Sequence, residues 1–287
     1  MSYTAPVETE GMCIHKIHSQ DDLASFFLRD SPYIHLYEMG DLDDIFWPHT
    51  SWISVSVNQH TQFTVLLYTG SNPPTLVALG SRVEWGERLI RSELFDVSDM
   101  PQRFHSHLAE GLVEALHTRL HGYIIESRVP YQRYYLSNAD AVWGVDTSAV
   151  EPLSPSDHEE VSAFYSLAYP NNWFDPRMLS TGCMLCIRSA RRCETTNSNI
   201  CAIAGVHVCS KRHRVAALGN IAVHPLHRKC GLATSVTAAL VQRLIRDDIK
   251  YIGLNVASDN LAAVKCYKSL GFSICMEFEE VMWAVAE

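Results

Sequence analysis

An apolar strand, a glycine-containing turn and an amphipathic helix follow one another at 215–247, and this order limits the fold most narrowly. The apolar segment 215–223 ends at the sequence HPLHRKCG, which contains Pro225 and Gly231. From about 232 to 247, apolar residues recur at helical spacing on one face. A strand that passes into a helix through a short turn is typical of an α/β layer. We therefore expect an α/β fold with a mixed sheet.

The turn has the features of an anion site. The first backbone N–H groups of a helix have no partner within the helix, and they lie at its positive end. Gly231 allows a ligand to approach the backbone closely, and Ala233 keeps the first helical turn thin. Arg228 and Lys229 add positive charge. The alternative is an ordinary strand–helix connection with a basic pair on the surface. The segment is neither a Walker loop nor a dinucleotide-binding fingerprint.

Composition and charge exclude several classes of partner. The 287 residues carry a formal net charge of −9, which argues against nucleic acid or an anionic membrane as the main partner. No apolar run reaches the length of about 20 residues that a membrane helix needs. The N-terminal residues lack the basic and apolar regions of a signal peptide. We expect a cytoplasmic location.

Cysteine and histidine pairs do not predict a metal site. In a cytoplasmic chain, the nine cysteines are expected to be reduced thiols that pack as small hydrophobes. Cys183 and Cys186 lie three apart on an expected strand and should point to opposite faces. His117 and His121 lie one helical turn apart near Glu114, so a metal pair is conceivable, but without a third ligand we prefer a solvated helix face. No metal is expected.

A Pro-, Ser- and acid-rich segment at 146–156 suggests two domains, 1–148 and 149–287. The first is expected to contain a helix, a meander of strands and a long second helix. The second is expected to contain two helices, three strands, and then alternating helices and strands that end with two closing strands. The expected helices are 21–28, 101–121, one that opens at SPSDHEEV, a short one after the aromatic loop YPNNWFDP, 232–247 and 259–270; the expected strands are 53–57, 63–68, 75–79, 183–188, 200–209, 215–223, KYIGLNVAS, FSICMEF and EVMWAVAE.

Two blocks together resemble the GNAT acyltransferase superfamily, whose members use acetyl-CoA or another acyl-CoA. The turn matches the pattern R/Q-x-x-G-x-G/A, and a V-x-P strand end precedes it. The stretch LNVASDNLAAVKCYKSLGF matches N-V-x-x-x-N-x-x-A-x-x-x-Y-x-x-x-G-F. The matching residues are Val223, Pro225, Arg228, Gly231 and Ala233 in the first block, and Asn255, Val256, Asn260, Ala263, Tyr267, Gly271 and Phe272 in the second.

The match covers roughly 150–287 and implies a GNAT-like fold there. The first half has no such loop at the start of 101–121 and looks like a degenerate acyltransferase half. Two-domain relatives similar to glycine N-acyltransferase have this layout.

The resemblance implies a place for the acyl-CoA. The sheet would splay between strands 215–223 and 251–257, and the pantetheine arm would pair with backbone in the gap. The pyrophosphate would lie on the N–H groups of 229–234, and an amide near Ala222 or Val223 would stabilise the thioester oxyanion. The residues expected to bind the co-substrate are Ile221, Ala222, Val223, Arg228, Lys229, Cys230, Gly231, Leu232, Ala233, Thr234, Asn255, Asn260 and Tyr267.

The resemblance also implies catalytic roles. Tyr267 would protonate the leaving thiolate, although it could instead be a core tyrosine. Members that place a catalytic glutamate on the fourth strand do so near Ala217, which cannot serve as a base. Asn220 could order a water, and His207 and His224 are the nearest titratable groups. We predict Tyr267, His207 and Asn220 as catalytic residues.

The implied activity is transfer of an acyl group, in the simplest case acetyl, from acyl-CoA to an amine of a small-molecule or amino-acid-like acceptor. The amine would attack directly in a ternary complex. Trp173 and Phe174 in the aromatic loop would line the acceptor pocket or cover the core. The alternatives are a catalytically inactive CoA-binding protein and a protein-interaction module.

Overall fold

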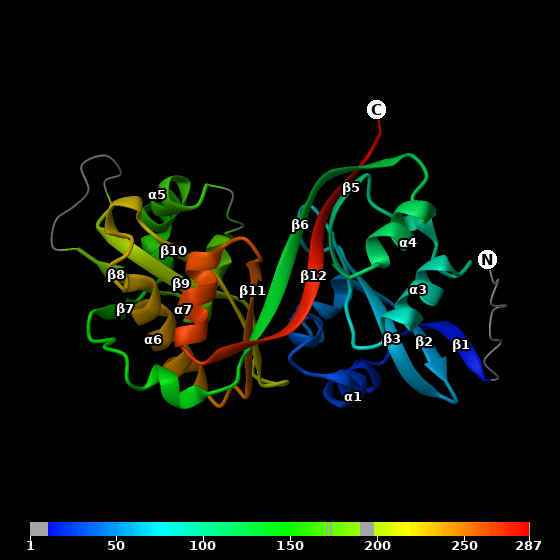
Figure 1. The fold of residues 1–287 in the computed structure, drawn as a ribbon, viewed down its shortest axis with the longest axis horizontal. Coiled ribbons are helices and arrows are strands. Elements are labelled where there is room, and N and C mark those ends of the chain that lie inside the picture. The colour runs from blue at the N-terminus through cyan, green and yellow to red at the C-terminus, as the bar shows by residue number, and fades with distance from the viewer. Residues whose placement is uncertain (1–10, 171, 173, 190–197, 287) are drawn as a thin grey trace. The chain divides into compact units, whose positions relative to one another are not determined.

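The computed structural model describes residues 11–170, 172, 174–189 and 198–286, and the chain forms two compact units (Figure 1). Unit 1 takes its residues from Met1–Tyr131 and Glu277–Glu287, and unit 2 is Gln132–Met276. This division differs from the expected boundary after residue 148. Two long strands explain the difference, since β6 (Tyr123–Leu136) and β12 (Phe272–Val285) each contribute residues to both units.

Unit 1 contains a mixed sheet in the order β1-β2-β3-β4-β5-β12, in which the β4–β5 pair is parallel and the other pairs from β1 to β12 are antiparallel. The expected first helix and three strands are confirmed. The elements are β1 (Met12–Ile17), α1 (Gln20–Asp30), α2 (Leu36–Gly40), a 3-10 turn (Trp47–His49), β2 (Thr50–Val57), β3 (His60–Tyr68), β4 (Thr75–Ala78), α3 (Val83–Arg91), a 3-10 turn (Val97–Asp99), β5 (Arg103–Ala109) and α4 (Leu112–Arg119).

The long helix expected over 101–121 is wrong. The structure has strand β5 followed by the eight-residue helix α4, with Gly111 at its N-cap in a left-handed conformation (φ +87°). A separation of four residues places two side chains on one face of a strand as well as of a helix. The buried pair Phe104 and Leu108 is therefore compatible with a helix and with a strand. The segment forms a strand because it pairs with β4 and β12.

Unit 2 contains a mixed sheet in the order β11-β10-β9-β8-β7, with helices on its two faces (Figure 1). The pair β10–β11 is parallel, and the others are antiparallel. The elements are a 3-10 turn (Ala139–Val142), β7 (Val150–Pro152), η4 (Pro155–Asp157), α5 (His158–Ala168), η5 (Pro176–Thr181), β8 (Leu185–Arg188), β9 (Ile200–Ser210), β10 (Val215–Val223), η6 (Pro225–His227), α6 (Leu232–Arg246), β11 (Tyr251–Ala257) and α7 (Leu261–Ser269).

Two hydrophobic clusters cover the sheet of unit 2. Cys183 belongs to the cluster that contains α6, and Cys186 belongs to the cluster that contains α5. The prediction that these cysteines point to opposite faces is confirmed, so they cannot share a metal ion. The two closing strands expected at the C-terminus form one strand, β12, because FSICMEFEEVMWAV contains no turn residue that would interrupt it.

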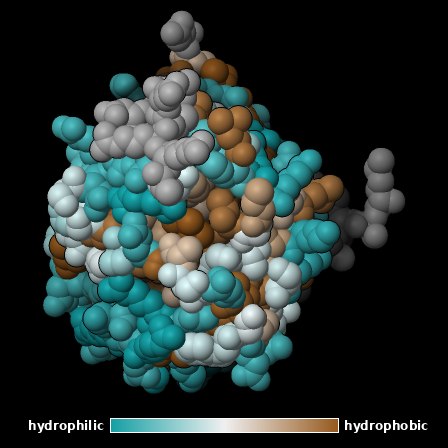
Figure 2. All heavy atoms as spheres, turned by 90° about the vertical axis from the view of Figure 1, so that its left-hand side faces the viewer, coloured by the Kyte–Doolittle hydropathy of each residue, from teal (hydrophilic) through white to brown (hydrophobic). Residues whose placement is uncertain are grey.

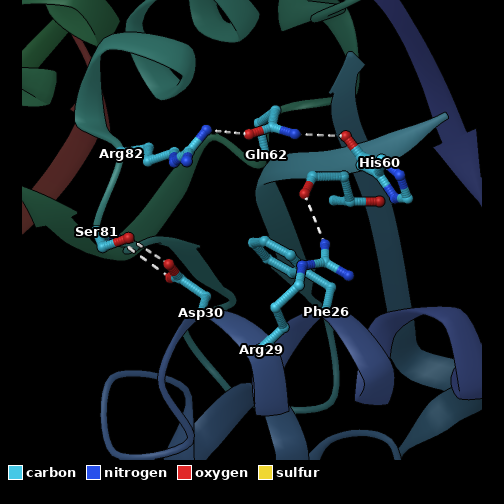
Figure 3. A pocket seen from close by; sticks show the side chains of 8 residues that line it. Phe26, Arg29, Asp30, His60, Gln62, Ser81 and Arg82 are labelled. Atoms are coloured by element: carbon cyan, nitrogen blue, oxygen red, sulfur yellow. Dashed lines mark hydrogen bonds between the residues drawn. The ribbon is translucent and has the colours of Figure 1, made fainter. Parts of the chain in front are cut away.

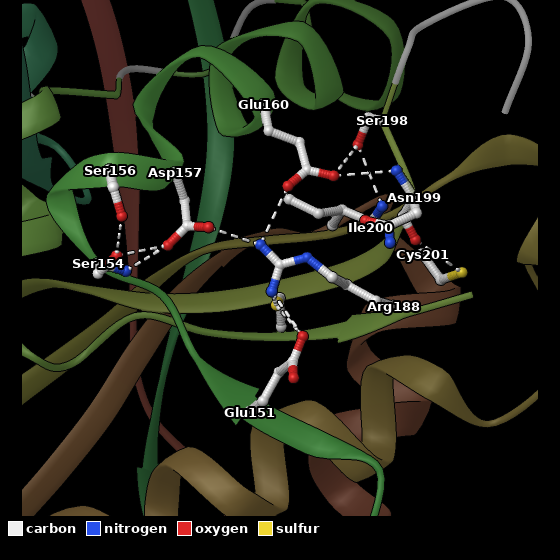
Figure 4. A network of polar contacts seen from close by, with 11 residues as sticks. Glu151, Ser154, Ser156, Asp157, Glu160, Arg188, Ser198, Asn199, Ile200 and Cys201 are labelled. Atoms are coloured by element: carbon white, nitrogen blue, oxygen red, sulfur yellow. Dashed lines mark hydrogen bonds and ion pairs between the residues drawn. The ribbon is translucent and has the colours of Figure 1, made fainter. Parts of the chain in front are cut away.

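An ionic network in unit 2 joins β7, β8 and the first turn of α5 (Figure 4). The Arg188 guanidinium lies 2.5 Å from Glu151, 2.8 Å from Asp157 and 3.0 Å from Glu160. Glu160 also accepts hydrogen bonds from the Ser198 hydroxyl and from a backbone N–H. Three carboxylates thus share one cation that is 21% exposed. Burial would raise the pKa of Asp157, but hydrogen bonds from Ser154 and the charge of Arg188 lower it below 3.8.

We predict that Arg188→Met lowers the free energy of unfolding by about 2 kcal/mol at neutral pH, because it leaves three neighbouring carboxylates without their cation. Since the folded-state pKa of Asp157 is depressed, its contribution is present above the unfolded pKa of about 3.9 and is lost as the pH falls through the folded value. The difference between variant and wild type should therefore shrink in acid, as measured by urea unfolding from pH 7 to about pH 3. Arg177→Met, which removes a cation that pairs with Asp175 at an 86% exposed position, should change stability by less than about 1 kcal/mol. Equal losses for the two variants would contradict the prediction.

Candidate functional site

The parallel strands β10 and β11 of unit 2 stay paired over only four residues. The pairing begins at Val215 with Tyr251 and ends at Leu218 with Leu254. In the described part of the chain, the remaining residues 219–223 and 255–257 are not paired with one another. Beyond Leu218, the edge of β10 that faces β11 is therefore not paired with that strand. The splay expected between these strands is confirmed.

A β-bulge shapes the same stretch of β10. The register with β9 shifts between Gly219 and Ala222, and Asn220 has a left-handed backbone (φ +56°). The Asn220 carbonyl accepts a hydrogen bond from the Tyr165 hydroxyl at 2.7 Å, and the side-chain Nδ2 donates to the Met178 sulfur at 3.1 Å. Its Oδ1 is buried and has no hydrogen-bond partner among the described residues. Asn220 therefore lies at the bulge with one acceptor still available.

The two candidate bases flank the bulge from different elements. His207 on β9 packs its imidazole directly over Gly219, where a Cβ would overlap the ring. His224, 4% exposed, caps η6, and its Nδ1 accepts from the backbone N–H of Leu226 at 3.2 Å. Burial lowers the pKa of His224, and the neighbouring charges of His227 and Arg228 lower it further. His224 is therefore neutral near pH 7.

The turn before α6 has the backbone conformation that an anion cradle needs. Lys229 and Gly231 both have positive φ values, of 63° and 77°, and Gly231 is the N-cap of the 15-residue helix α6. A Cβ on Gly231 would meet nothing within 4 Å, so the space over the helix N-terminus is open. The Arg228 guanidinium donates weakly to the carbonyls of Val223 and Ala168, at 3.4 and 3.5 Å. Arg228 thus connects the turn to β10 and to the end of α5.

Apolar side chains are exposed around this turn. Leu226 is 80% exposed, and Leu167 and Tyr169 near the end of α5 are each 42% exposed. Figure 2, which views one face of the molecule, shows hydrophobic residues gathered toward the middle of that face among hydrophilic ones. A basic turn next to apolar surface suits a ligand that combines an anionic group with an apolar chain.

Tyr267 is placed by α7, which follows β11. Its side chain is 7% exposed, and its ring lies 6.2 Å from that of Phe272. Burial raises the pKa of Tyr267, with smaller contributions from Cys266 and Tyr169. The phenol is therefore protonated throughout the neutral range, as a proton donor must be.

The two asparagines of the second block make local contacts. Asn260 is the N-cap of α7 and accepts from the backbone N–H of Ala263 at 3.2 Å. Asn255 accepts from Nε of Arg133 at 2.9 Å. Arg133 is a fully buried arginine on β6, a strand that the sequence pattern did not predict, so its contact with Asn255 was not expected. Thr234 on α6 lies 3.4 Å from the Cys266 sulfur, which joins α6 to α7.

The aromatic loop is described in part. The Phe174 ring lies 5.3 Å from that of Tyr165, whose hydroxyl binds the bulge. Phe174 is therefore near β10, as an acceptor-site wall would be. Trp173 lies outside the described residues.

A pocket of about 500 Å³ in unit 1 is a competing location (Figure 3). Arg29 donates to the carbonyl of Thr61, Arg82 donates to Gln62, and Ser81 donates to Asp30. Arg29 and Arg82 thus already donate hydrogen bonds to acceptors within the protein. None of the sequence motifs lies in this pocket, so we place the candidate site at β10 and the α6 turn.

None of the helices in the described part of the chain combines the length and the apolar character that crossing a bilayer requires.

The chain is similar to known proteins over a range that includes β10 and α6. Residues 156–272 match the model of the acetyltransferase (GNAT) family. No curated protein matches the sequence significantly. Solved structures share the fold at low sequence identity. A Drosophila protein has a TM-score of 0.65 at 11% identity and covers 96% of this chain and 99% of that chain. A GNAT-family acetyltransferase from Colwellia psychrerythraea has a TM-score of 0.55 at 13% identity and covers 94% and 99%. A GCN5-related N-acetyltransferase from Sphaerobacter thermophilus has a TM-score of 0.53 at 12% identity and covers 95% of both chains.

We predict that Gly219→Ala destabilises the protein by about 1–3 kcal/mol, because the new methyl group displaces the His207 ring. The matched control is Gly205→Ala at the paired position on β9, where the Cβ meets the flexible Met184 side chain at 3.2 Å and the Gly219 carbonyl oxygen at an ordinary contact distance of 3.6 Å. Urea unfolding should show the smaller loss for the control. In a His207→Ala background the cost of Gly219→Ala should nearly vanish, and a cost that persists there would show that the ring is not the obstacle.

Proposed function

We propose that this chain transfers an acyl group from acyl-CoA to an amine, because residues 156–272 match the model of the acetyltransferase (GNAT) family. The proposed donor is acetyl-CoA, and the proposed acceptor is a small molecule or an amino-acid-like amine. The resemblance to two-domain relatives similar to glycine N-acyltransferase supports the acceptor class.

The observation that carries this proposal is the short pairing of β10 with β11. The part of β10 that is not paired with β11, residues 219–223, leads directly into the turn with Lys229 and Gly231. An extended amide chain can add to a free strand edge by backbone hydrogen bonds. A pyrophosphate can bind the N–H groups at the start of a helix. In CoA, the amide-containing pantetheine arm is followed by the pyrophosphate. The pantetheine arm would therefore lie along Ile221–Val223, and the pyrophosphate would lie at residues 229–234.

The reaction would proceed by direct attack. The amine nitrogen forms a bond to the thioester carbonyl carbon, and the carbonyl oxygen takes negative charge, which a β10 amide near Ala222 or Val223 would stabilise. The carbon–sulfur bond then breaks, and Tyr267 gives its phenol proton to the leaving thiolate. The amine loses its proton to a base, directly or through water. Tyr267 regains a proton from solvent at the end of the cycle.

The mechanism needs a base that accepts the proton of the attacking amine. Ala217 is fully buried and carries no titratable group, so it cannot take the role. His224 is neutral and 4% exposed, and its Nδ1 is engaged by Leu226, which makes it a poor acceptor of a substrate proton. We propose that His207 is the base and that the free Oδ1 of Asn220 orients a water. A CoA-binding protein without catalysis is the second candidate, and the missing glutamate favours it.

The test uses the full chain with acetyl-CoA and a panel of amines, and follows the release of free thiol. Thiol release that depends on one amine class, with the acylated amine identified by mass spectrometry, would support the proposed function. No turnover together with a CoA-dependent rise in melting temperature would favour the inactive CoA-binding protein. The absence of any effect of CoA would exclude both.

We predict that Tyr267→Phe lowers kcat by about 10²-fold or more, because the thiolate loses its proton donor. The dissociation constant of CoA should change by less than about threefold, since the ring remains in place. The matched control is Tyr251→Phe at the start of β11, beside the paired part of the strands, which should leave kcat unchanged. Steady-state kinetics and calorimetric CoA titration separate the two quantities. An unchanged kcat for Tyr267→Phe would remove the tyrosine from the mechanism.

We predict that Gly231→Ala weakens CoA binding at least about tenfold, because the methyl group occupies the open space over the helix N-terminus and strains the left-handed backbone. Gly111→Ala is the matched control, since Gly111 is also a left-handed N-cap with no atom within 4 Å of its Cβ. Both variants should lose about 1–2 kcal/mol of stability. Only Gly231→Ala should weaken CoA binding in the titration. Equal CoA affinities for the two variants would contradict the proposal that the turn at Gly231 binds the pyrophosphate.

A further inference from the structure

Two histidines and a glutamate of unit 1 converge on the paired strands β5 and β12, and none of them is proposed for acyl transfer. His105 and His107 lie two apart on β5, so their side chains share one face. Glu280 on β12 is the direct antiparallel partner of His107. One ligand atom from each of the three residues lies within 4.8 Å of the others.

The distances suit a metal ion better than a hydrogen-bond network alone. His107 Nε2 lies 3.3 Å from Glu280 Oε1, which a hydrogen bond would also explain. His105 Nε2 lies 3.8 Å from Glu280 Oε2, which is too long for a hydrogen bond. Tetrahedral Zn²⁺ with bonds of about 2.0–2.1 Å holds its ligand atoms about 3.3 Å apart. The distance from His107 to Glu280 equals that separation, and the distance from His105 to Glu280 exceeds it by about 0.5 Å.

Neighbouring residues hold the carboxylate and one imidazole in place. Tyr131 donates a hydrogen bond to Glu280, as outer partners of metal ligands often do. The His107 ring contacts the Tyr37 ring, at a centroid distance of 6.0 Å, and the Phe278 ring, at 5.5 Å. The side chains of the three ligands are 27%, 11% and 18% exposed for His105, His107 and Glu280. An ion there would have three protein ligands and an approach for water at a fourth position.

We propose that His105, His107 and Glu280 bind a divalent transition-metal ion of the Zn²⁺ class. Imidazole nitrogens with one carboxylate are the donors that Zn²⁺ and Co²⁺ accept, whereas Mg²⁺ and Ca²⁺ prefer oxygen alone. The ion would crosslink β5 to the C-terminal part of β12 and so stabilise unit 1 by mass action. This inference is independent of the proposed acyl transfer.

The test uses the full chain after removal of metal with a chelator and dialysis. Zn²⁺ affinity is measured by competition with a colorimetric indicator, and Co²⁺ is added to read the ligand type from its absorption spectrum. Wild type is expected to bind one ion through nitrogen and oxygen, with a rise in melting temperature. His107→Ala and the conservative Glu280→Gln are expected to lose at least about tenfold in affinity. His121→Ala, an exposed histidine of the same unit, is the matched control and should bind as wild type does.

Three results would overturn the proposal. One is a Zn²⁺ affinity of Glu280→Gln equal to that of wild type. The melting temperature of this variant in chelator shows separately whether it is folded. Another is a Co²⁺ spectrum with thiolate charge-transfer bands, which would assign the ion to some of the nine cysteines. If wild type binds no Zn²⁺ at micromolar concentration, the three residues form only a polar cluster, and the proposal is wrong.

Discussion

The separation of β10 from β11 after Leu218 is the constraint on which the rest of unit 2 depends. A parallel strand that leaves its neighbour exposes backbone groups that would cost free energy if they were buried without partners. The change in strand direction takes place at the bulge, where Asn220 has a left-handed backbone. On its other side, β10 remains paired with β9 before and after the bulge. The hydroxyl of Tyr165 satisfies the Asn220 carbonyl, so α5 stabilises the distortion directly.

Gly219 lies where β10 leaves β11, and it is packed against the side chain of His207. Gly219 leaves room for the imidazole of His207, which could not lie there beside any other residue. The imidazole occupies the space that a side chain at position 219 would take. The buried amide oxygen of Asn220 has no hydrogen-bond partner among the described residues, which is costly unless a ligand or water binds it. The fold therefore tolerates an unsatisfied group at the place where the proposed reaction needs a polar contact.

Elements with one dominant periodicity could be predicted from the sequence, and elements that depend on a partner could not. Strand 215–223 and the helix that begins at 232 were predicted with nearly correct bounds, because their apolar patterns fit one structure only. The apolar residues of 101–121 fit two periodicities, and the neighbouring strands decided between them. The group around His105 joins residues that are 175 positions apart in the chain, as the pair Ser106 and Val281 beside it also shows. Only the register of β5 with β12 reveals it.

Two helix N-termini of similar backbone geometry carry opposite charges, and the difference favours an external anion at only one of them. Gly111 begins α4 with Glu110 before it and Glu114 in its first turn, so carboxylates of the chain already meet the positive end of the helix dipole. Gly231 begins α6 with Arg228 and Lys229 before it and no acidic residue in the first turn. Cations at the start of a helix oppose its dipole, and in a chain of net charge −9 they are not a consequence of composition. A bound polyanion would reverse that repulsion, because it would interact favourably with the basic side chains and with the helix N–H groups at once.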